Sequence, residues 1–98
     1  MTYNTGFNAF VGKTPVEASL TTTSSQVLAA NTNRKFLSVT NTGLKKAFIA
    51  WDQTAVVDKG IPLRKDATYN FDSAGISLGA LNALTESGTT TLAFQEGE

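Results

Sequence analysis

The sequence predicts an all-β fold, an antiparallel β-sandwich of jelly-roll type with seven or eight short strands. Short runs alternate apolar and polar residues, and turn residues separate these runs roughly every 8 to 12 positions. No segment shows a sustained helical period. With 98 residues, the chain is long enough for one core. We expect the sandwich to span residues 16–98, after an extended N-terminal arm at residues 1–15.

The arm is rich in Asn, Thr and Gly, yet it contains several apolar side chains. Phe7, Phe10 and Val11 follow no period of 2 or 3.6, so no regular element is predicted there. Exposed aromatic residues reduce solubility unless something buries them. The arm therefore packs on its own domain, is buried by a neighbouring subunit, or is mobile. These three residues are candidate interface residues.

The first strands are predicted from alternation. Val16, Ala18 and Leu20 alternate with polar residues, which indicates a strand with one buried face. A second strand is expected within the run Val27 to Ala30, before the polar turn at Asn31 to Asn33.

The stretch from Asn31 to Trp51 predicts a central β-hairpin. One arm contains Phe36, Leu37 and Val39, and the other contains Phe48, Ile49 and Trp51. The turn between them would be Asn41, Thr42 and Gly43, which are typical turn residues. These two arms are expected to form the centre of the core.

The second half predicts four further strand segments. Ile61 to Leu63 contains Pro62, which favours an edge position. Thr68 to Asp72 places Tyr69 and Phe71 on one face. A terminal hairpin would pair the segment around Leu81 to Leu84 with Thr90 to Gln95. Either of the two alternating sets of side chains in the first segment could point inward, whereas Leu92 and Phe94 of the second face the core.

Charge is balanced overall but segregated along the chain, with eight basic and eight acidic residues. Seven bases lie between Arg34 and Lys65, and five acids and no base follow from Asp66 onward. If these blocks separate in space, copies could meet head to tail, whereas antiparallel pairing could also interleave them into a mixed surface. Two basic pairs are candidate interface residues, namely Arg34 with Lys35 and Lys45 with Lys46.

The residue inventory predicts a protein that is not an enzyme and has no catalytic residues, cofactor or metal. The chain has neither His nor Cys, so Ser-His-Asp and Cys-His sites and disulfides are excluded. Its aspartates stand beside turn residues, where acids usually cap turns. The residue inventory does not exclude a calcium site, which needs only oxygen ligands, although no spacing of residues singles one out. Neutral net charge gives no case for nucleic-acid or membrane partners.

Trp51 and Tyr69 allow a different function. Exposed aromatic rings can stack on a sugar or a base, so these two residues are candidate ligand-stacking residues. The competing interpretation places Trp51 as a packing residue at one end of the sandwich. The N-terminus lacks the basic and apolar regions of a signal peptide, and no run is long enough to span a membrane, so synthesis in a cytoplasm is expected.

Three segments carry a resemblance to a known class: VLAANTNRKFLSVTNTG, GIPLRKDATYNFD and GALNALTESGTTTLAFQEG. They resemble small β-sandwich structural proteins of tailed-bacteriophage virions, of the head-decoration type. The resemblance implies a homo-oligomeric capsid decoration or cement protein, made in the host cytoplasm and bound to the major capsid protein or another virion protein on the head surface. The alternative is a carbohydrate- or receptor-binding module of a phage tail or fibre.

Overall fold

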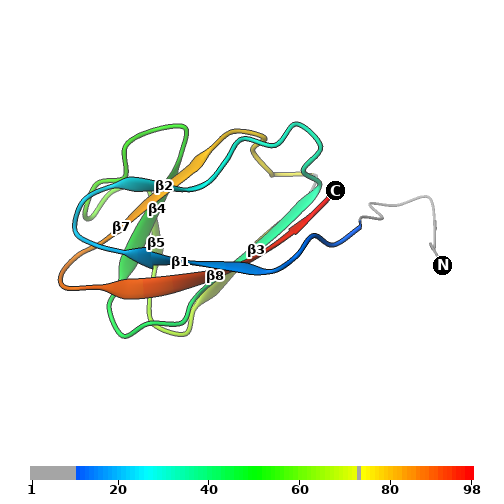
Figure 1. The fold of residues 1–98 in the computed structure, drawn as a ribbon. Coiled ribbons are helices and arrows are strands. Elements are labelled where there is room, and N and C mark those ends of the chain that lie inside the picture. Colours follow the sequence, from blue (N-terminus) through cyan, green and yellow to red (C-terminus); the bar gives the residue numbers. More distant parts are fainter. Residues whose placement is uncertain (1–10, 73) are drawn as a thin grey trace.

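The protein is a sandwich of two four-stranded antiparallel sheets (Figure 1). The computed structural model describes residues 11–72 and 74–98. Its strands are β1 (Val16–Leu20), β2 (Ser25–Leu28), β3 (Phe36–Asn41), β4 (Ala47–Trp51), β5 (Ile61–Leu63), β6 (Thr68–Phe71), β7 (Leu81–Thr85) and β8 (Thr90–Gly97). In these residues there is no helix long and apolar enough to cross a membrane.

The strand order is that of a jelly roll. One sheet has the order β1-β8-β3-β6 and the other β2-β7-β4-β5. Every connection except β4–β5 therefore crosses from one sheet to the other, as in the double-sheet folds made of two Greek keys. This confirms the predicted all-β sandwich. Strand β5, which contains Pro62, lies at a sheet edge as predicted, because proline cannot donate to a ladder.

The core lies between the sheets and follows the alternation of the strands. Leu37 and Val39 of β3 lie beside Leu92 and Phe94 of β8 in one sheet, and together they face Ile49 of β4 across an apolar interior. The other buried members are Leu20, Leu28, Ala47, Leu63, Leu81 and Ala83. In β7 it is thus Leu81 and Ala83 that point inward.

The central hairpin predicted from Asn31 to Trp51 is wrong. Strand β3 pairs with β6 and β8, and β4 pairs with β5 and β7, so the two predicted arms belong to different sheets. The predicted terminal hairpin is wrong for the same reason, because β7 and β8 also lie in opposite sheets. Alternation identifies a strand and its buried face, but in this topology consecutive strands other than β4 and β5 belong to opposite sheets and do not pair with each other.

Two aromatic residues assigned to the central core lie elsewhere. Phe36 shares a face with Ser38 and Thr40, and it is half-buried on the outer side of its sheet. Phe48 is buried on the outer face of the other sheet, where it packs against Leu84 and Ala55. Ala55 belongs to the β4–β5 connection, which folds over that face. A local apolar run cannot reveal that the loop after the strand folds back and covers one of its two faces.

The described root of the arm is fixed to the C-terminal end of β8. The backbone amide of Val11 donates to the Glu98 carbonyl at 2.6 Å, and the amide of Glu98 donates back at 2.8 Å. The Lys13 amide donates to the Glu96 carbonyl at 2.9 Å. The side chain of Val11 is 67% exposed. Phe7 and Phe10 lie outside the described residues, so their predicted interface role stays a prediction.

Candidate functional site

Two groups of polar side chains close the two ends of the sandwich. The first lies where the β2–β3 and β6–β7 connections and the C-terminus come together (Figure 1), and we call it the Arg34 end. The second lies where β3 ends, around Asn41, and we call it the Asn41 end. The candidate interface residues are divided between these ends, with Val11, Arg34 and Lys35 at the first and Lys45 and Lys46 at the second.

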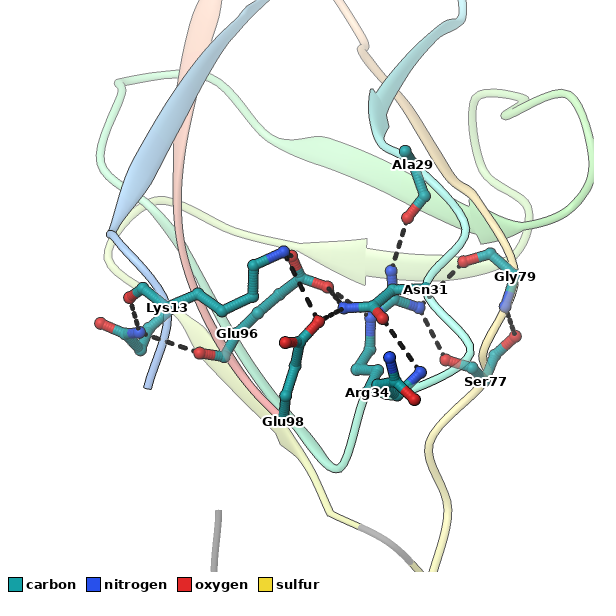
Figure 2. Close-up of polar contacts among 10 residues, drawn as sticks. Lys13, Ala29, Asn31, Arg34, Ser77, Gly79, Glu96 and Glu98 are labelled. Carbon is teal, nitrogen blue, oxygen red and sulfur yellow. Dashed lines mark hydrogen bonds and ion pairs between the residues drawn. The ribbon is translucent and has the colours of Figure 1, made fainter. Parts of the chain in front are cut away.

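Arg34 is a buried anchor of its end. Its guanidinium donates to the carbonyl oxygens of Ser77 at 2.7 Å, Gly79 at 2.9 Å and Ala29 at 2.7 Å (Figure 2). Its Nε donates to Glu96 at 2.8 Å, and its side chain has no exposed surface. Removing a charge from water is tolerated only when such partners replace the solvent. Arg34 thus ties two loops to β8, and its guanidinium is not presented at the surface.

Glu96 and Glu98 connect this anchor to the root of the arm. Lys13 Nζ lies 3.7 Å from a carboxylate oxygen of each, and Asn31 donates to both side chains (Figure 2). Burial by itself raises the pKa of Glu96. Hydrogen bonds from Arg34 and Asn31 and the charges of Arg34 and Lys13 outweigh burial, and the net result is a pKa below the ordinary 4.5. Glu96 is therefore an ionised structural partner.

Trp51 and Tyr69, the candidate stacking residues, are engaged within the protein. Arg34 lies over the Trp51 ring at 5.2 Å, and the rings of Trp51 and Phe71 form a T-shaped pair with centroids 5.6 Å apart and an interplanar angle of 81°. Tyr69 stacks on Phe71 at 6.2 Å and 30°. Because both rings contact Phe71 at such different angles, their planes are strongly inclined to each other. Together they cannot form one flat platform for a sugar.

The surface of the Arg34 end is hollowed by a shallow groove of about 630 Å³. Its apolar part comes from Ile76 and the 44% exposed Leu78. Its other lining residues are Thr32, Asn33, Arg34, Lys35 and Glu98. A second groove of about 530 Å³ lies beside the arm root, between the edge strands β1 and β2. Lys35 is exposed, so of the first basic pair only Lys35 presents its charge at the surface.

The Asn41 end is organised by a buried asparagine that the sequence analysis placed in a turn. Asn41 is fully buried, and its amide donates to the carbonyls of Lys45 at 2.7 Å and Leu63 at 2.8 Å. Its side-chain oxygen accepts from the Gly43 amide at 3.0 Å and from the Thr90 hydroxyl at 2.9 Å. The sequence did contain a signal for this burial, because Asn41 has the same place in the strand alternation as the inward-facing Leu37 and Val39.

In the basic pair at this end, Lys45 is exposed and Lys46 is partly buried. The Lys46 ammonium lies 5.0 Å from the centre of the Phe48 ring, where a cation–π contact is favourable. The Lys46 carbonyl accepts from the buried Thr85 hydroxyl at 2.9 Å. The two basic pairs lie at opposite ends of β3 and form no single patch.

The carboxylates of the connecting loops support backbone conformation. Asp52, Asp58 and Asp66 adopt positive φ angles of 59°, 65° and 64°, a region that Asp tolerates better than most residues. Asp52 also accepts a hydrogen bond from the Ala80 amide at 3.0 Å, and Asp72 accepts one from Ala74. Among the residues that the structure describes, no group of three or more acidic, His or Cys side chains could hold a metal ion.

Comparisons with known proteins show the fold alone. No family model and no curated protein matches the chain. A solved structure of a de novo designed double-stranded β-helix is similar, with a TM-score of 0.52 and 10% identity over 88% of this chain and 100% of that chain. A structure described as Bacillus endospore appendages, a family of disulfide-linked pili, has a TM-score of 0.48 and 13% identity over 90% and 88% of the two chains. The first agrees with the jelly-roll strand order.

Proposed function

We propose that this protein is a non-enzymatic structural component of a bacteriophage virion, a decoration or cement protein that binds the outer surface of the head. Its partner is the major capsid protein or a neighbouring virion protein, and it acts as a homo-oligomer. The sequence resemblance of residues 27–43, 60–72 and 79–97 suggested this class. Jelly rolls are frequent in capsid proteins, which agrees with the proposal without deciding it.

The observation that carries the proposal is the placement of the surface candidates at opposite ends of a braced sandwich. Val11 and Lys35 lie at the Arg34 end, and Lys45 and Lys46 at the Asn41 end. Buried polar networks fix the loops at both ends, so the distance between the two contact regions is set by the sheets. A cement protein must bridge neighbouring subunits at many equivalent positions, and two fixed contact regions suit that task.

The internal contacts of the carboxylates and aromatic rings support this proposal over an enzyme or a sugar-binding module. Glu96 is held ionised in an ion pair with Arg34, and Asp52 and Asp72 are bonded to backbone amides. A general acid would need a proton at neutral pH, which the lowered pKa of Glu96 opposes. The inclined rings of Trp51 and Tyr69 argue against a sugar-stacking module.

Binding to purified undecorated heads tests the proposal. Full-length protein should bind saturably and resist washing. A variant lacking residues 1–10 should bind at least about tenfold more weakly, as expected when aromatic anchors are removed from an interface. The deletion stops at residue 10 because Val11 and Lys13 bond to β8.

Circular dichroism and thermal unfolding should show that the deleted variant keeps its fold. Absence of saturable binding by the full-length protein would contradict the decoration role. Specific signals on a glycan array, lost in Tyr69→Ala, would favour the carbohydrate-binding alternative instead.

A further inference from the structure

The β3–β4 connection exposes a leucine at the Asn41 end. Leu44 is 77% exposed, which is the largest exposed fraction among the large apolar side chains of the described residues. Lys45 and Lys46 follow it directly. We call Leu44, Lys45 and Lys46 the tip.

The tip is built on a loop that the structure holds from several sides. Asn41 bonds the Gly43 amide and the Lys45 carbonyl, and the Thr42 amide donates to Thr91 at 2.9 Å. A Cβ on Gly43 would lie 2.7 Å from the Thr91 nitrogen, so the loop backbone touches β8. Such a loop loses little conformational entropy on binding, which is the condition for an efficient anchor. Exposure of Leu44 is thus not the result of a loose loop.

The complementary surface lies at the opposite end of the same chain. The groove there contains Ile76 and the 44% exposed Leu78, which can receive an apolar side chain. Glu98 and the exposed Lys35 line the groove as well. The charge of Arg34 is paired with Glu96, and Glu98 lies 3.7 Å from the ammonium of Lys13.

The charges of the two ends are biased in opposite directions. Around the tip, the loops contain four bases and two acids: Lys45, Lys46, Arg64, Lys65, Asp66 and Glu86. At the Arg34 end, four acids stand against three bases: Asp52, Asp72, Glu96, Glu98, Lys13, Arg34 and Lys35. The acidic and basic sequence blocks are thus interleaved at the Arg34 end, while a basic excess remains at the Asn41 end.

We propose that the protein associates with itself head to tail, with the Leu44 tip of one copy docked in the Ile76–Leu78 groove of the next. The tip follows β3 and the groove lies where β3 begins, so a molecule cannot fill its own groove. The contact is heterologous and leaves a free tip and a free groove in every open oligomer. Such contacts close into rings or continue as filaments, depending on the rotation between neighbours. The inference goes beyond head binding and does not require it.

A complementation experiment with two arginine variants tests this contact. Leu44→Arg disables the tip and Leu78→Arg disables the groove, and each should weaken self-association at least about tenfold in sedimentation velocity. An equimolar mixture retains one intact tip and one intact groove. The mixture should therefore form a 1:1 dimer, and it should not form larger assemblies. Val56→Arg is the matched control, because Val56 is a 45% exposed valine in the β4–β5 connection.

Three results would overturn the proposal. Wild-type protein that stays monomeric at millimolar concentration has no such contact. A mixture that stays monomeric, although each variant is impaired, indicates a symmetric contact. Loss of association in Leu78→Arg but not in Leu44→Arg means that another segment, such as residues 1–10 of a neighbour, fills the groove.

Lys45→Glu/Lys46→Glu should weaken association more at low than at high salt, because salt screens the charge bias.

Discussion

At the scale of single residues, Arg34 and Asn41 organise the two ends of the molecule. Each is buried, and each uses its side chain to hold loops that are distant in the sequence. Within the described residues, no buried side-chain nitrogen or oxygen lacks a hydrogen-bond partner. Fully satisfied buried networks favour one arrangement of the surrounding loops, because a partly broken network leaves costly unpaired groups.

Asn41→Ala should lower the free energy of unfolding by about 2 to 5 kcal/mol. The substitution removes four hydrogen bonds and leaves the Thr90 hydroxyl and the Leu63 carbonyl without their side-chain partner. Asn70→Ala is the control, because Asn70 is exposed on β6 and should change stability by less than about 0.5 kcal/mol. Denaturant unfolding measures both. Equal effects would contradict the role assigned to Asn41.

Glu96 makes stability depend on pH. Its pKa is lowered in the folded protein, so its contribution is present above the ordinary value of 4.5 and is lost as the pH falls through the folded value. Glu96→Gln should therefore cost about 1 to 2 kcal/mol at pH 7, and less near pH 3, because the lowered pH favours the protonated carboxyl. Unfolding of wild type and variant at both pH values tests this, with the exposed Glu86→Gln as control. If the difference in unfolding free energy between wild type and Glu96→Gln is the same at both pH values, the ion-pair explanation is refuted.

At the scale of elements, alternation predicted which segments are strands, and it predicted many of their buried faces. Tyr69 and Phe71 of β6 do share a face, because they stand opposite Val39 and Leu37 of β3. Leu92 and Phe94 of β8 also point inward as predicted. The partners of the strands were predicted wrongly, because turn residues such as Gly43 suit a tight hairpin and a sheet-to-sheet crossing equally well.

The faces of β3 give a direct test at this scale. Leu37→Ala and Val39→Ala should each cost about 2 to 4 kcal/mol, because both side chains are fully buried in the core. Ser38→Ala should change the unfolding free energy by less than about 0.5 kcal/mol. Phe36→Ala should cost less than Leu37→Ala, because Phe36 is only half-buried on the outer face. A larger loss at Phe36 than at Leu37 would show that the face assignment is inverted.

At the scale of the whole molecule, the jelly-roll order places six of the seven pairs of consecutive strands in opposite sheets. Both termini of the described chain meet at the Arg34 end, where Val11 pairs with Glu98. The Leu44 tip lies at the other end. This polarity gives the molecule two unlike ends, which is why head-to-tail contacts are possible.

An engineered disulfide tests the topology. Thr40 and Thr68 are directly paired between β3 and β6, and their hydroxyls lie 2.7 Å apart. Because the chain has no cysteine, Thr40→Cys/Thr68→Cys should oxidise to a single intramolecular disulfide without loss of fold. Thr40→Cys/Asn70→Cys is two residues out of register and should oxidise poorly. Thiol titration and mass spectrometry distinguish the two, and equal oxidation would contradict the β3–β6 register.

The sequence by itself determined the fold class, the approximate strands and the use of aspartates in turns, because these depend on local alternation and backbone preference. Only the tertiary structure decided the strand partners, the burial of Arg34 and Asn41, the outward placement of Phe48, and the separation of the tip from the groove. Each of these depends on residues far apart in the chain. Arg34, for example, needs carbonyls from three positions and a carboxylate from β8. No local pattern contains that arrangement, since it exists only after the two sheets have packed.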